Sequence, residues 1–518
     1  MRPVRDLLDR TLGRVTMYRL VLIVLAVIIA VYCVFTATGV IEGLSTRDNL
    51  VALAVLVVAS YVSNRVLGLL WRVSPHADSA HITALLLFFL FVPVPSGSAD
   101  LAWLAGAAVL ANASKYVLAW RGRHVLNPAA AGAFLVFAIQ NLVGRDLAVS
   151  PIWQTAATEP LLPFVAVGAL LVLWRTRRLD LGVVLVVPAL VLIVWGLVDA
   201  GQPVGDAVRS ALTSYPILFI AGFMVSEPLT LPPRRAQQLV VAAVTAVVLA
   251  YPTAIAVTGA EPFSAGWFGI TPEVAILVGN LVAFALSRRT GVRLDYRGKR
   301  HLGGDVWELA FVPARPVRFD AGQYVELHVP HGGADVRGVR RVFSISSPPG
   351  ADELTVAIRV PERASSLKRE LVDLPAGTRV RATGVGGDFL LPADAPVLLV
   401  AGGIGVTPFV SQLRSRDLAS SAVLVYGVAD GDEVAYRDEL LESGARVVVV
   451  SPNTPEHLPE GWEHVQSTVV TGDVIDSAVP DAAERRAFVS GPPLMVNAVR
   501  GPLRRRTRSV RTDYFSGY

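Results

Sequence analysis

The first 290 residues consist of long apolar runs separated by short polar loops. Apolar runs of about 17–25 residues are long enough to cross a bilayer as helices. They predict ten membrane helices, at residues 19–41, 50–71, 79–95, 101–120, 127–144, 161–175, 180–198, 211–226, 236–258 and 272–288. The first run is longer than the apolar region of a signal peptide, and no clear small-residue cleavage pattern follows it. We therefore expect a signal-anchor helix there.

After Arg293 the pattern changes to alternating apolar and polar residues. The segments WELAFVP, YVELHVP, LTVAIRVP and RVRATGV predict short antiparallel strands with Pro and Gly turns. From about Ala395, the apolar runs PVLLVAGG, AVLVYGV, ARVVVVSP and RAFVSGPP alternate with helical stretches, which predicts an α/β sheet. We expect a multi-domain protein: a polytopic α-helical membrane domain at 1–290, an antiparallel β-barrel at 295–393 and an α/β nucleotide-binding domain at 394–518.

Positive charge falls in alternate loops of the membrane half. Arginines precede the first predicted helix and follow the second, fourth, sixth, eighth and tenth. They are Arg2, Arg5, Arg10, Arg14, Arg19, Arg72, Arg121, Arg123, Arg175, Arg177, Arg178, Arg234, Arg235, Arg288, Arg289 and Arg293. Intervening loops such as PSGSAD and DAGQPVGD are poor in positive charge. Because Lys and Arg mark cytoplasmic loops, we expect a multi-pass protein of the cell membrane, in contact with lipid, with both termini in the cytoplasm.

Composition agrees with a large apolar part and excludes some classes of function. Of 518 residues, 53% are hydrophobic and 17% are charged, whereas soluble domains contain about 25% charged residues. The arginines lie at the ends of apolar runs rather than in one basic stripe, so nucleic acid is not an expected partner. The single cysteine, Cys33, cannot form an internal disulfide or hold an iron–sulfur cluster. No metal site is predicted.

Four short motifs carry the chemistry of the soluble half. The glycine-rich stretch AGGIGVTPF, residues 401–409, connects an apolar strand to a helical segment. Such a turn can cradle a phosphate, although it is also a common tight turn. RVFSISS at 341–347 and GVGGDF at 384–389 precede it, and SGPPLM at 490–495 follows the last buried strand. The chain ends in RTDYFSGY, residues 511–518.

These motifs, in this order, resemble the ferredoxin-NADP reductase family, in which a flavin-binding barrel precedes a nicotinamide-binding lobe. The resemblance covers about residues 295–518 and implies FAD and NADH or NADPH as cofactors. The residues that it places at these cofactors are Arg341, Phe343, Ser344, Ser347, Ser365, Ser366, Gly402, Gly403, Gly405, Thr407, Pro408, Ser490, Gly491, Pro492, Phe515 and Tyr518.

Each position also has a physical rationale. The planar fork of Arg341 can pair with the flavin pyrophosphate. Ser344 is placed to hydrogen-bond flavin N5, and Ser490 leaves a polar atom beside the transferred hydride, so these two serines are the candidate catalytic residues. Phe343 can pack on the flavin but lacks the hydroxyl of the family's usual Tyr. Ser365 or Ser366, at a predicted helix start, can offer backbone N–H groups to the pyrophosphate.

Two further features concern the nicotinamide. Phe515 and Tyr518 can stack over the flavin and be displaced by nicotinamide, unless the terminal strand simply packs; Tyr514 is a third aromatic there. After the strand AVLVYG, where users of NADPH need a positive group, the chain carries Asp430 and Asp432. This acidic turn favours NADH.

Three stretches that contain polar residues interrupt the apolar sequence of the predicted membrane domain: DSAHITALLL at 78–87, HVLNPAAAG at 124–132 and FMVSEPLT at 223–230. They resemble stretches of the membrane D subunit of Rnf-type complexes and of the B subunit of sodium-pumping NADH:quinone reductase, over about 60–285. Asn127 and Glu227, each before a Pro, are expected at cytoplasmic helix ends, where freed backbone groups can meet a polar ligand or where the side chains simply cap helices.

That family carries FMN, in some members attached to a Thr. The nearest text here is IWQTAAT, residues 152–158, in which Ile152 and Ala156 depart from the family's pattern. Thr158 stands where the family has its attachment Thr, but these two departures count against a covalent bond there, and a noncovalent FMN is the alternative.

The expected function is a membrane-bound flavoprotein oxidoreductase. It would pass electrons from NAD(P)H through FAD to a membrane acceptor, either a second flavin or a quinone, or to a partner redox protein. A haem-containing ferric reductase is the first alternative, but His76, His81 and His124 are too few for two bis-histidine haems. The second alternative is a haem-free transporter or membrane anchor with a regulatory flavin reductase domain.

Overall fold

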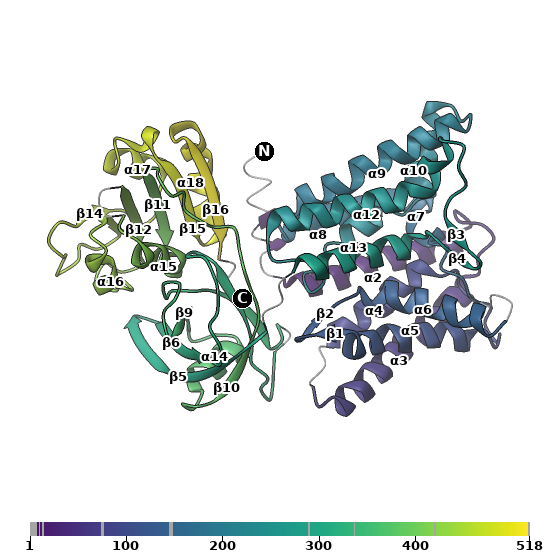
Figure 1. The fold of residues 1–518 in the computed structure, drawn as a ribbon, viewed down its shortest axis with the longest axis horizontal. Helices are drawn as coiled ribbons and strands as arrows, with labels where there is room; N and C mark the ends of the chain where they lie inside the picture. Colours follow the sequence, from purple (N-terminus) through teal and green to yellow (C-terminus); the bar gives the residue numbers. More distant parts are fainter. Residues whose placement is uncertain are drawn as a thin grey trace. The chain divides into compact units, whose positions relative to one another are not determined.

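The computed structural model describes residues 8–9, 11–12, 15–73, 77–144, 149–287, 291–335, 337–418 and 421–515. The chain divides into two compact units (Figure 1). One comprises residues 14–288 and is helical, and the other comprises residues 289–518 together with the first 13 residues.

The helical unit is built from apolar helices with short connections. Its elements are α2 (Met17–Ala37), α3 (Thr46–Leu70), α4 (Ala77–Leu90), α5 (Leu101–Val117), β1 (Ala119–Trp120), β2 (Arg123–His124), α6 (Pro128–Leu142), α7 (Gln154–Ala157), η1 (Glu159–Leu161), α8 (Leu162–Arg175), α9 (Leu179–Asp199), α10 (Val204–Thr213), α11 (Ile217–Phe219), η2 (Ile220–Met224), α12 (Arg235–Ala256), β3 (Ser264–Ala265), β4 (Phe268–Gly269) and α13 (Pro272–Leu286).

Each of the ten segments predicted as membrane helices contains helix. Among the described residues, however, only α2, α3, α9 and α12 are long and apolar enough to cross a membrane, with a fifth span if α10 and the bent segment 217–224 count as one. The others are shorter, and polar residues and prolines bound some of them, as at Asn127–Pro128, where α6 begins. Ten spans therefore stay a prediction.

Small residues bring the helices of this unit close together. A Cβ on Gly132 of α6 would lie 2.5 Å from the Ala107 carbonyl oxygen and from the Cβ of Ala111 on α5. A Cβ on Gly196 of α9 would lie 2.3 Å from the Thr253 carbonyl oxygen on α12. Such small-residue contacts are typical of helices packed in membranes, where close van der Waals contact replaces the hydrophobic effect.

The second unit begins with a six-stranded antiparallel sheet, ordered β8-β7-β10-β5-β6-β9. The elements of this part are β5 (Val292–Gly303), β6 (Val306–Pro313), β7 (Tyr324–His328), β8 (Arg340–Ser344), β9 (Leu354–Arg359), α14 (Ser366–Asp373) and β10 (Arg379–Gly386). The edge strands meet at one bridge, from Ile345 to Val356. These pairings show an antiparallel sheet, and its full closure into a barrel stays a prediction.

The rest of this unit is a parallel sheet, ordered β14-β13-β12-β11-β15-β16, with helices around it (Figure 1). Its elements are β11 (Val397–Gly402), η3 (Gly403–Val406), α15 (Thr407–Ser415), β12 (Ala422–Gly427), α16 (Arg437–Glu442), β13 (Arg446–Ser451), β14 (Glu463–Gln466), α17 (Gly472–Ala478), η4 (Ala482–Glu484), β15 (Arg486–Gly491), α18 (Pro493–Arg506) and β16 (Ser509–Tyr514). The strand order reverses between β11 and β15. Ligands of doubly wound sheets bind at the carboxyl ends of such strands.

Candidate functional site

The glycine-rich turn lies at this reversal point of the parallel sheet. Gly402 ends β11 and Thr407 begins α15, as predicted. A Cβ on Gly405 would lie 2.4 Å from the Ser490 carbonyl oxygen, and one on Gly402 would lie 2.4 Å from the Met495 sulfur. Gly403 has a φ of +51° and nothing within 4 Å of the Cβ position. Two glycines are thus required by the chain's own packing, and Gly403 is the one beside open space.

The SGPP segment closes the other side of this turn. Ser490 is fully buried, and its hydroxyl makes no hydrogen bond within the described part of the chain. The backbone N–H of Phe515 donates to the Gly491 carbonyl at 2.9 Å, so the C-terminal strand passes beside this segment. A hydroxyl without a partner fits a polar ligand atom. The stacking roles of Phe515 and Tyr518 stay predictions, and Tyr518 lies outside the described residues.

Arg341 supplies unused hydrogen-bond donors at the antiparallel sheet. Its Nη1 donates to the carbonyls of Arg337 and Arg340, both at 2.5 Å, but its Nε and Nη2 are buried with no partner among the described residues. Burial and then the charge of Arg341 lower the pKa of Lys368, and Arg337 adds to the effect. A cluster of cations with free guanidinium donors fits an anionic group such as a pyrophosphate.

The start of α14 is already engaged by the chain. Ser365 caps the helix by accepting from the Lys368 N–H at 3.4 Å. The Ser366 N–H donates to Asp335 Oδ2 at 3.0 Å, and the Ser366 hydroxyl accepts from the Asp335 N–H at 2.9 Å. The expected donation from Ser366 to a pyrophosphate would therefore require Asp335 to move.

The remaining predicted residues of the sheet differ in their surroundings. Ser344 ends β8 and is 7% exposed, next to Tyr324 in the register with β7. Phe343 packs into the apolar core of the sheet. Ser347 accepts two hydrogen bonds: its hydroxyl from the Thr355 N–H at 3.1 Å and its carbonyl from the Ser411 hydroxyl at 2.7 Å. Ser347 thus joins this sheet to α15, and flavin contacts of all three residues stay predictions.

Two sites within the nucleotide-binding lobe carry carboxylates: Asp513, and the pair Asp430 and Asp432. Asp513 pairs with Ser490 in the register of β15 and β16, and burial raises the pKa of Asp513 to about 6. Asp430 and Asp432 follow β12. Hydrogen bonds from the Asp432 N–H and the Asn453 side chain lower the pKa of Asp430, so this turn is negatively charged at neutral pH.

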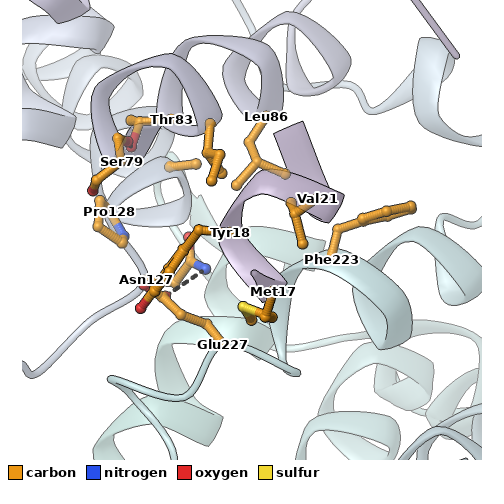
Figure 2. A pocket seen from close by; sticks show the side chains of 12 residues that line it. Met17, Tyr18, Val21, Ser79, Thr83, Leu86, Asn127, Pro128, Phe223 and Glu227 are labelled. Carbon is orange, nitrogen blue, oxygen red and sulfur yellow. Dashed lines mark hydrogen bonds between the residues drawn. The ribbon is translucent and has the colours of Figure 1, made fainter. Parts of the chain in front are cut away.

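The three polar stretches of the helical unit converge on one small cavity (Figure 2). Its volume is about 40 Å³. The residues that line it are Met17, Tyr18, Val21, Ser79, Ile82, Thr83, Leu86, Asn127, Pro128, Ala129, Phe223 and Glu227. Each stretch contributes polar and apolar side chains, although about 140 residues separate the first from the last. Residues of all three stretches therefore lie together in the structure.

Glu227 and Asn127 form the polar wall of this cavity (Figure 2). Asn127 Nδ2 donates to Glu227 Oε2 at 3.3 Å, and the Asn127 N–H donates to Asn280 Oδ1 at 2.6 Å. His124 Nδ1 lies 3.7 Å from Glu227 Oε1. Asn127 also caps α6 by accepting from the Ala130 N–H at 3.2 Å, so the helix-cap role is present, and a ligand site shared with Glu227 stays a prediction.

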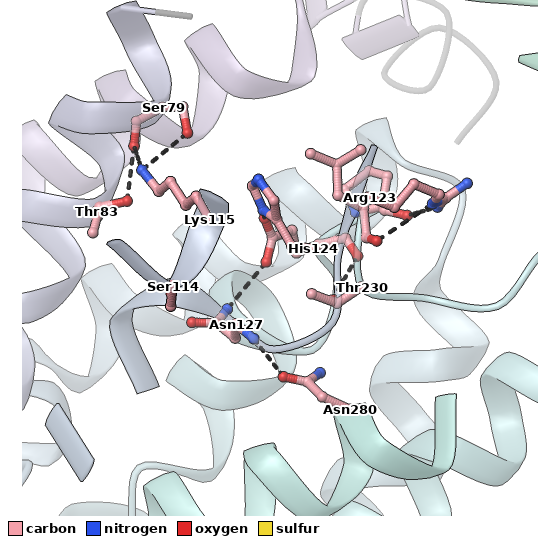
Figure 3. Close-up of polar contacts among 12 residues, drawn as sticks. Ser79, Thr83, Ser114, Lys115, Arg123, His124, Asn127, Thr230 and Asn280 are labelled. Atoms are coloured by element: carbon pink, nitrogen blue, oxygen red, sulfur yellow. Dashed lines mark hydrogen bonds and ion pairs between the residues drawn. The ribbon is translucent and has the colours of Figure 1, made fainter. Parts of the chain in front are cut away.

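A buried lysine lies close to this wall (Figure 3). Lys115 Nζ donates to the Ser79 carbonyl at 3.0 Å and to Asn112 Oδ1 at 2.9 Å. Thr83 donates to the same Ser79 carbonyl at 2.8 Å. Polar and charged groups within a membrane unit are costly and usually mark a functional path.

Residues 399–501 match the family described as "Oxidoreductase NAD-binding domain". The C-terminal part of this chain is an FAD- and NAD-binding reductase module. An aromatic O-demethylase reductase subunit from Amycolatopsis is 35% identical over 38% of this chain and 60% of its own length. A ferredoxin–NADP reductase from Sorangium cellulosum is 37% identical over 27% of this chain and 59% of its own length.

A solved structure is similar to part of this chain as well. A cytochrome P450 reductase from Amycolatopsis is 27% identical and covers 43% of this chain and 69% of that one, with a TM-score of 0.36. The chain spans about 60% of the length of the curated relatives named above. The two curated relatives are reductases, and both matches cover less than half of this chain.

The helical unit gives no such support for FMN. Ligand pockets usually have about 300–1,000 Å³, and the cavity of about 40 Å³ cannot hold a three-ring flavin as it stands. Thr158 follows α7 and is not among the residues that line the cavity. The structure therefore does not bring Asn127 and Thr158 to one site, and no step through FMN is derived.

Sequence reasoning missed several polar residues around the reductase module. Glu308 and Tyr436 are buried and hydrogen-bonded to each other at 3.0 Å across 128 residues. Asp335 was missed in the same way. No local motif marks these residues. A polar residue in an otherwise apolar run, such as Glu308 in VWELAFVP, was the one available signal.

Proposed function

We propose that this protein passes electrons from NAD(P)H, through FAD in its reductase module, to a quinone-type acceptor in its membrane half. The observation that carries the proposal is the convergence of three polar stretches on one cavity in a chain that also holds a reductase module. The reductase subunits among its relatives support the first half of this path. When bound, FAD supplies a centre that accepts hydride from nicotinamide and can release electrons one at a time.

The domain assignment belongs to the same proposal: a membrane domain at 1–290, an FAD-binding barrel at 295–393 and a nucleotide-binding domain at 394–518. Arg341 would hold the flavin pyrophosphate, and Ser344 and Ser490 would lie beside the transferred hydride. The charged turn at Asp430 and Asp432 would repel a 2′-phosphate, which favours NADH over NADPH.

A quinone fits the cavity better than a second flavin for a reason of size and polarity. Its head group is a single small ring with two carbonyl acceptors, so the cavity of about 40 Å³ needs less widening than for a flavin. Met17, Val21 and Leu86 offer an apolar side. The Asn127 amide donates to Glu227 and to the Met224 carbonyl, so a quinone carbonyl would replace one of these two acceptors. The reaction balances as NADH + H⁺ + quinone → NAD⁺ + quinol.

The test is a comparison of two electron acceptors with the detergent-purified full chain. Ferricyanide takes electrons directly from reduced flavin in solution, whereas a short-chain ubiquinone would need the membrane site. We expect Glu227→Gln and Asn127→Ala to lower quinone reduction by about tenfold, the loss from about 1.4 kcal/mol of binding or transition-state energy, while ferricyanide reduction stays unchanged. Glu42→Gln, at an exposed loop position, is the control.

Two results would contradict the proposal. Wild-type protein that reduces ferricyanide but no quinone would leave the membrane half as an anchor or a transporter with a regulatory reductase domain. Equal losses with both acceptors would place the effect of Glu227 in the stability of the whole chain. A second flavin recovered by extraction, at one FMN per chain, would replace the quinone as the immediate acceptor.

A further inference from the structure

Tyr436 belongs to the nucleotide-binding lobe, but its side chain also contacts the antiparallel sheet. It precedes α16, is 1% exposed and packs in the apolar core of this lobe. Its φ is +62°, in the left-handed region that bulky residues rarely adopt. Its hydroxyl donates to Glu308 Oε1 at 3.0 Å, on β6 of the antiparallel sheet. A strained and buried tyrosine thus links the two sheets by a hydrogen bond.

Glu308 gathers contacts from both sheets. The side chain is 7% exposed, and its Oε1 also accepts from the Ser346 hydroxyl at 3.0 Å. Its Oε2 accepts from Arg300 Nη2 at 2.8 Å, and Arg300 also pairs with Glu439 of α16. A buried carboxylate is costly unless it is paired and hydrogen-bonded. Each of these donors therefore helps to hold the Glu308 carboxylate in its position.

The same network leads to the residues expected at the cofactors. Ser346 lies two residues after Ser344 and shares a hydrogen bond of 2.7 Å with the Thr355 hydroxyl. On the other side, Ser411 of α15, the helix that follows the glycine-rich turn, donates to the Ser347 carbonyl at 2.7 Å. The contacts therefore join the end of β8 to the lobe that carries Gly403 and Ser490.

We propose that Tyr436 is a positioning residue for hydride transfer in the reductase module. Its bond to Glu308 sets the distance between the sheet that carries Ser344 and the lobe that carries Ser490. Hydride transfer requires the reacting atoms to approach within about 3–3.5 Å, and a displacement of about 1 Å can slow such a step about 100-fold. Neither Tyr436 nor Glu308 is a catalytic residue in this proposal, because both act through the serines and the glycine turn.

Tyr426 provides a matched control. It is also 1% exposed, and its hydroxyl hydrogen-bonds to the backbone of Ala435 within the nucleotide-binding lobe. Tyr426→Phe therefore removes a buried hydroxyl without touching the link between the sheets. Glu308→Gln and Glu308→Ala form a second pair, since Gln keeps an oxygen that can accept from Tyr436 and Ala does not.

The experiment is stopped-flow reduction of the full chain by NADH, with no membrane acceptor present. In Tyr436→Phe we expect the limiting rate of FAD reduction to fall about tenfold or more, with FAD content and the half-saturating NADH concentration within about twofold of wild type. Tyr426→Phe should keep the limiting rate within about twofold, and Glu308→Gln should be faster than Glu308→Ala. Hydrogen exchange should speed up at 306–313 and 437–442 in Tyr436→Phe alone.

The outcomes separate this inference from the proposed function, on whose NADH-to-FAD step it rests. A wild-type limiting rate in Tyr436→Phe would overturn it, as would an equal loss in Tyr426→Phe. If Tyr436→Phe does not fold, the two Glu308 variants decide, and equal rates for them would overturn it. Loss of quinone reduction in Glu227→Gln would leave this result untouched, because no quinone takes part in the measured step.

Discussion

Asp513 shows how a single half-buried side chain can make the reductase module sensitive to pH. It sits in the terminal strand beside Ser490, and burial raises the pKa of its carboxyl to about 6. A raised pKa means that the native state favours the protonated form. The contribution of Asp513 to the free energy of unfolding is therefore fully present below the unfolded pKa of about 3.9. It is lost as the pH rises through about 6.

We expect Asp513→Asn to gain stability relative to wild type as the pH rises. Two pKa units correspond to about 2.7 kcal/mol, but Asp513 is partly exposed, so a change of about 1–2 kcal/mol between pH 4.5 and pH 7.5 is expected after discounting for solvent. Melting of the purified chain, followed by FAD fluorescence at both pH values, measures this difference. A difference that does not change with pH, or that shrinks as the pH rises, would show that Asp513 is not held in its protonated form.

At the scale of elements, the glycine-rich turn works as a packed corner between β11, α15 and β15. Gly402 and Gly405 allow the Ser490–Met495 segment to approach the turn, and Thr407 donates to the Ile404 carbonyl at 2.5 Å. The reversal of strand order between β11 and β15 leaves open space beside Gly403. The turn is therefore closely packed at Gly402 and Gly405 and open at Gly403, where we expect the dinucleotide to bind.

We expect Gly405→Ala to destabilise the packing of the glycine-rich turn. The added Cβ would lie 2.4 Å from the Ser490 carbonyl oxygen and 2.7 Å from the Gly491 Cα, both backbone atoms, so overpacking should cost about 1–3 kcal/mol. We expect weaker NADH binding with FAD retained, measured by titration and by cofactor extraction. Gly298→Ala is the control, because nothing lies within 4 Å of its Cβ position. An equal effect of both substitutions would contradict the packing argument.

At the scale of the whole molecule, charge and apolar length describe a membrane protein with one reductase module. Arginines occupy alternate loops of the membrane half, and four described helices are long enough to span a bilayer. From the positive-inside rule we expect the C-terminal module in the cytoplasm, where it would meet reduced nicotinamide.

Membrane vesicles of opposite orientation test this topology. Inside-out vesicles should oxidise added NADH, and sealed right-side-out vesicles should do so only after permeabilisation, because NADH does not cross a bilayer. The activity ratio between sealed and permeabilised right-side-out vesicles is the measurement. Full activity in sealed right-side-out vesicles would place the reductase module outside the cell and would reject the predicted orientation.

Much of the candidate site could be predicted because its signals are local. The strand, glycine turn and helix at 397–415 form one continuous segment, and a short apolar run followed by glycines and a helical stretch marks it in the sequence. The three polar stretches were also visible, because each is a polar interruption in an apolar run. The number of spans was less predictable, since apolar length alone does not distinguish a spanning helix from a short helix that ends at a proline.

The sequence by itself determined the division into an apolar and a soluble half, the strand-rich reductase module, and the positions of the glycine turn and of Asn127 and Glu227. These follow from periodicity and from residue types that act over a few positions. The tertiary structure decided which distant side chains meet: Tyr436 with Glu308, Asp335 with Ser366, and Ser79 with Lys115. The physical reason is that a buried polar atom needs a partner, and only the packed chain decides which residue provides it.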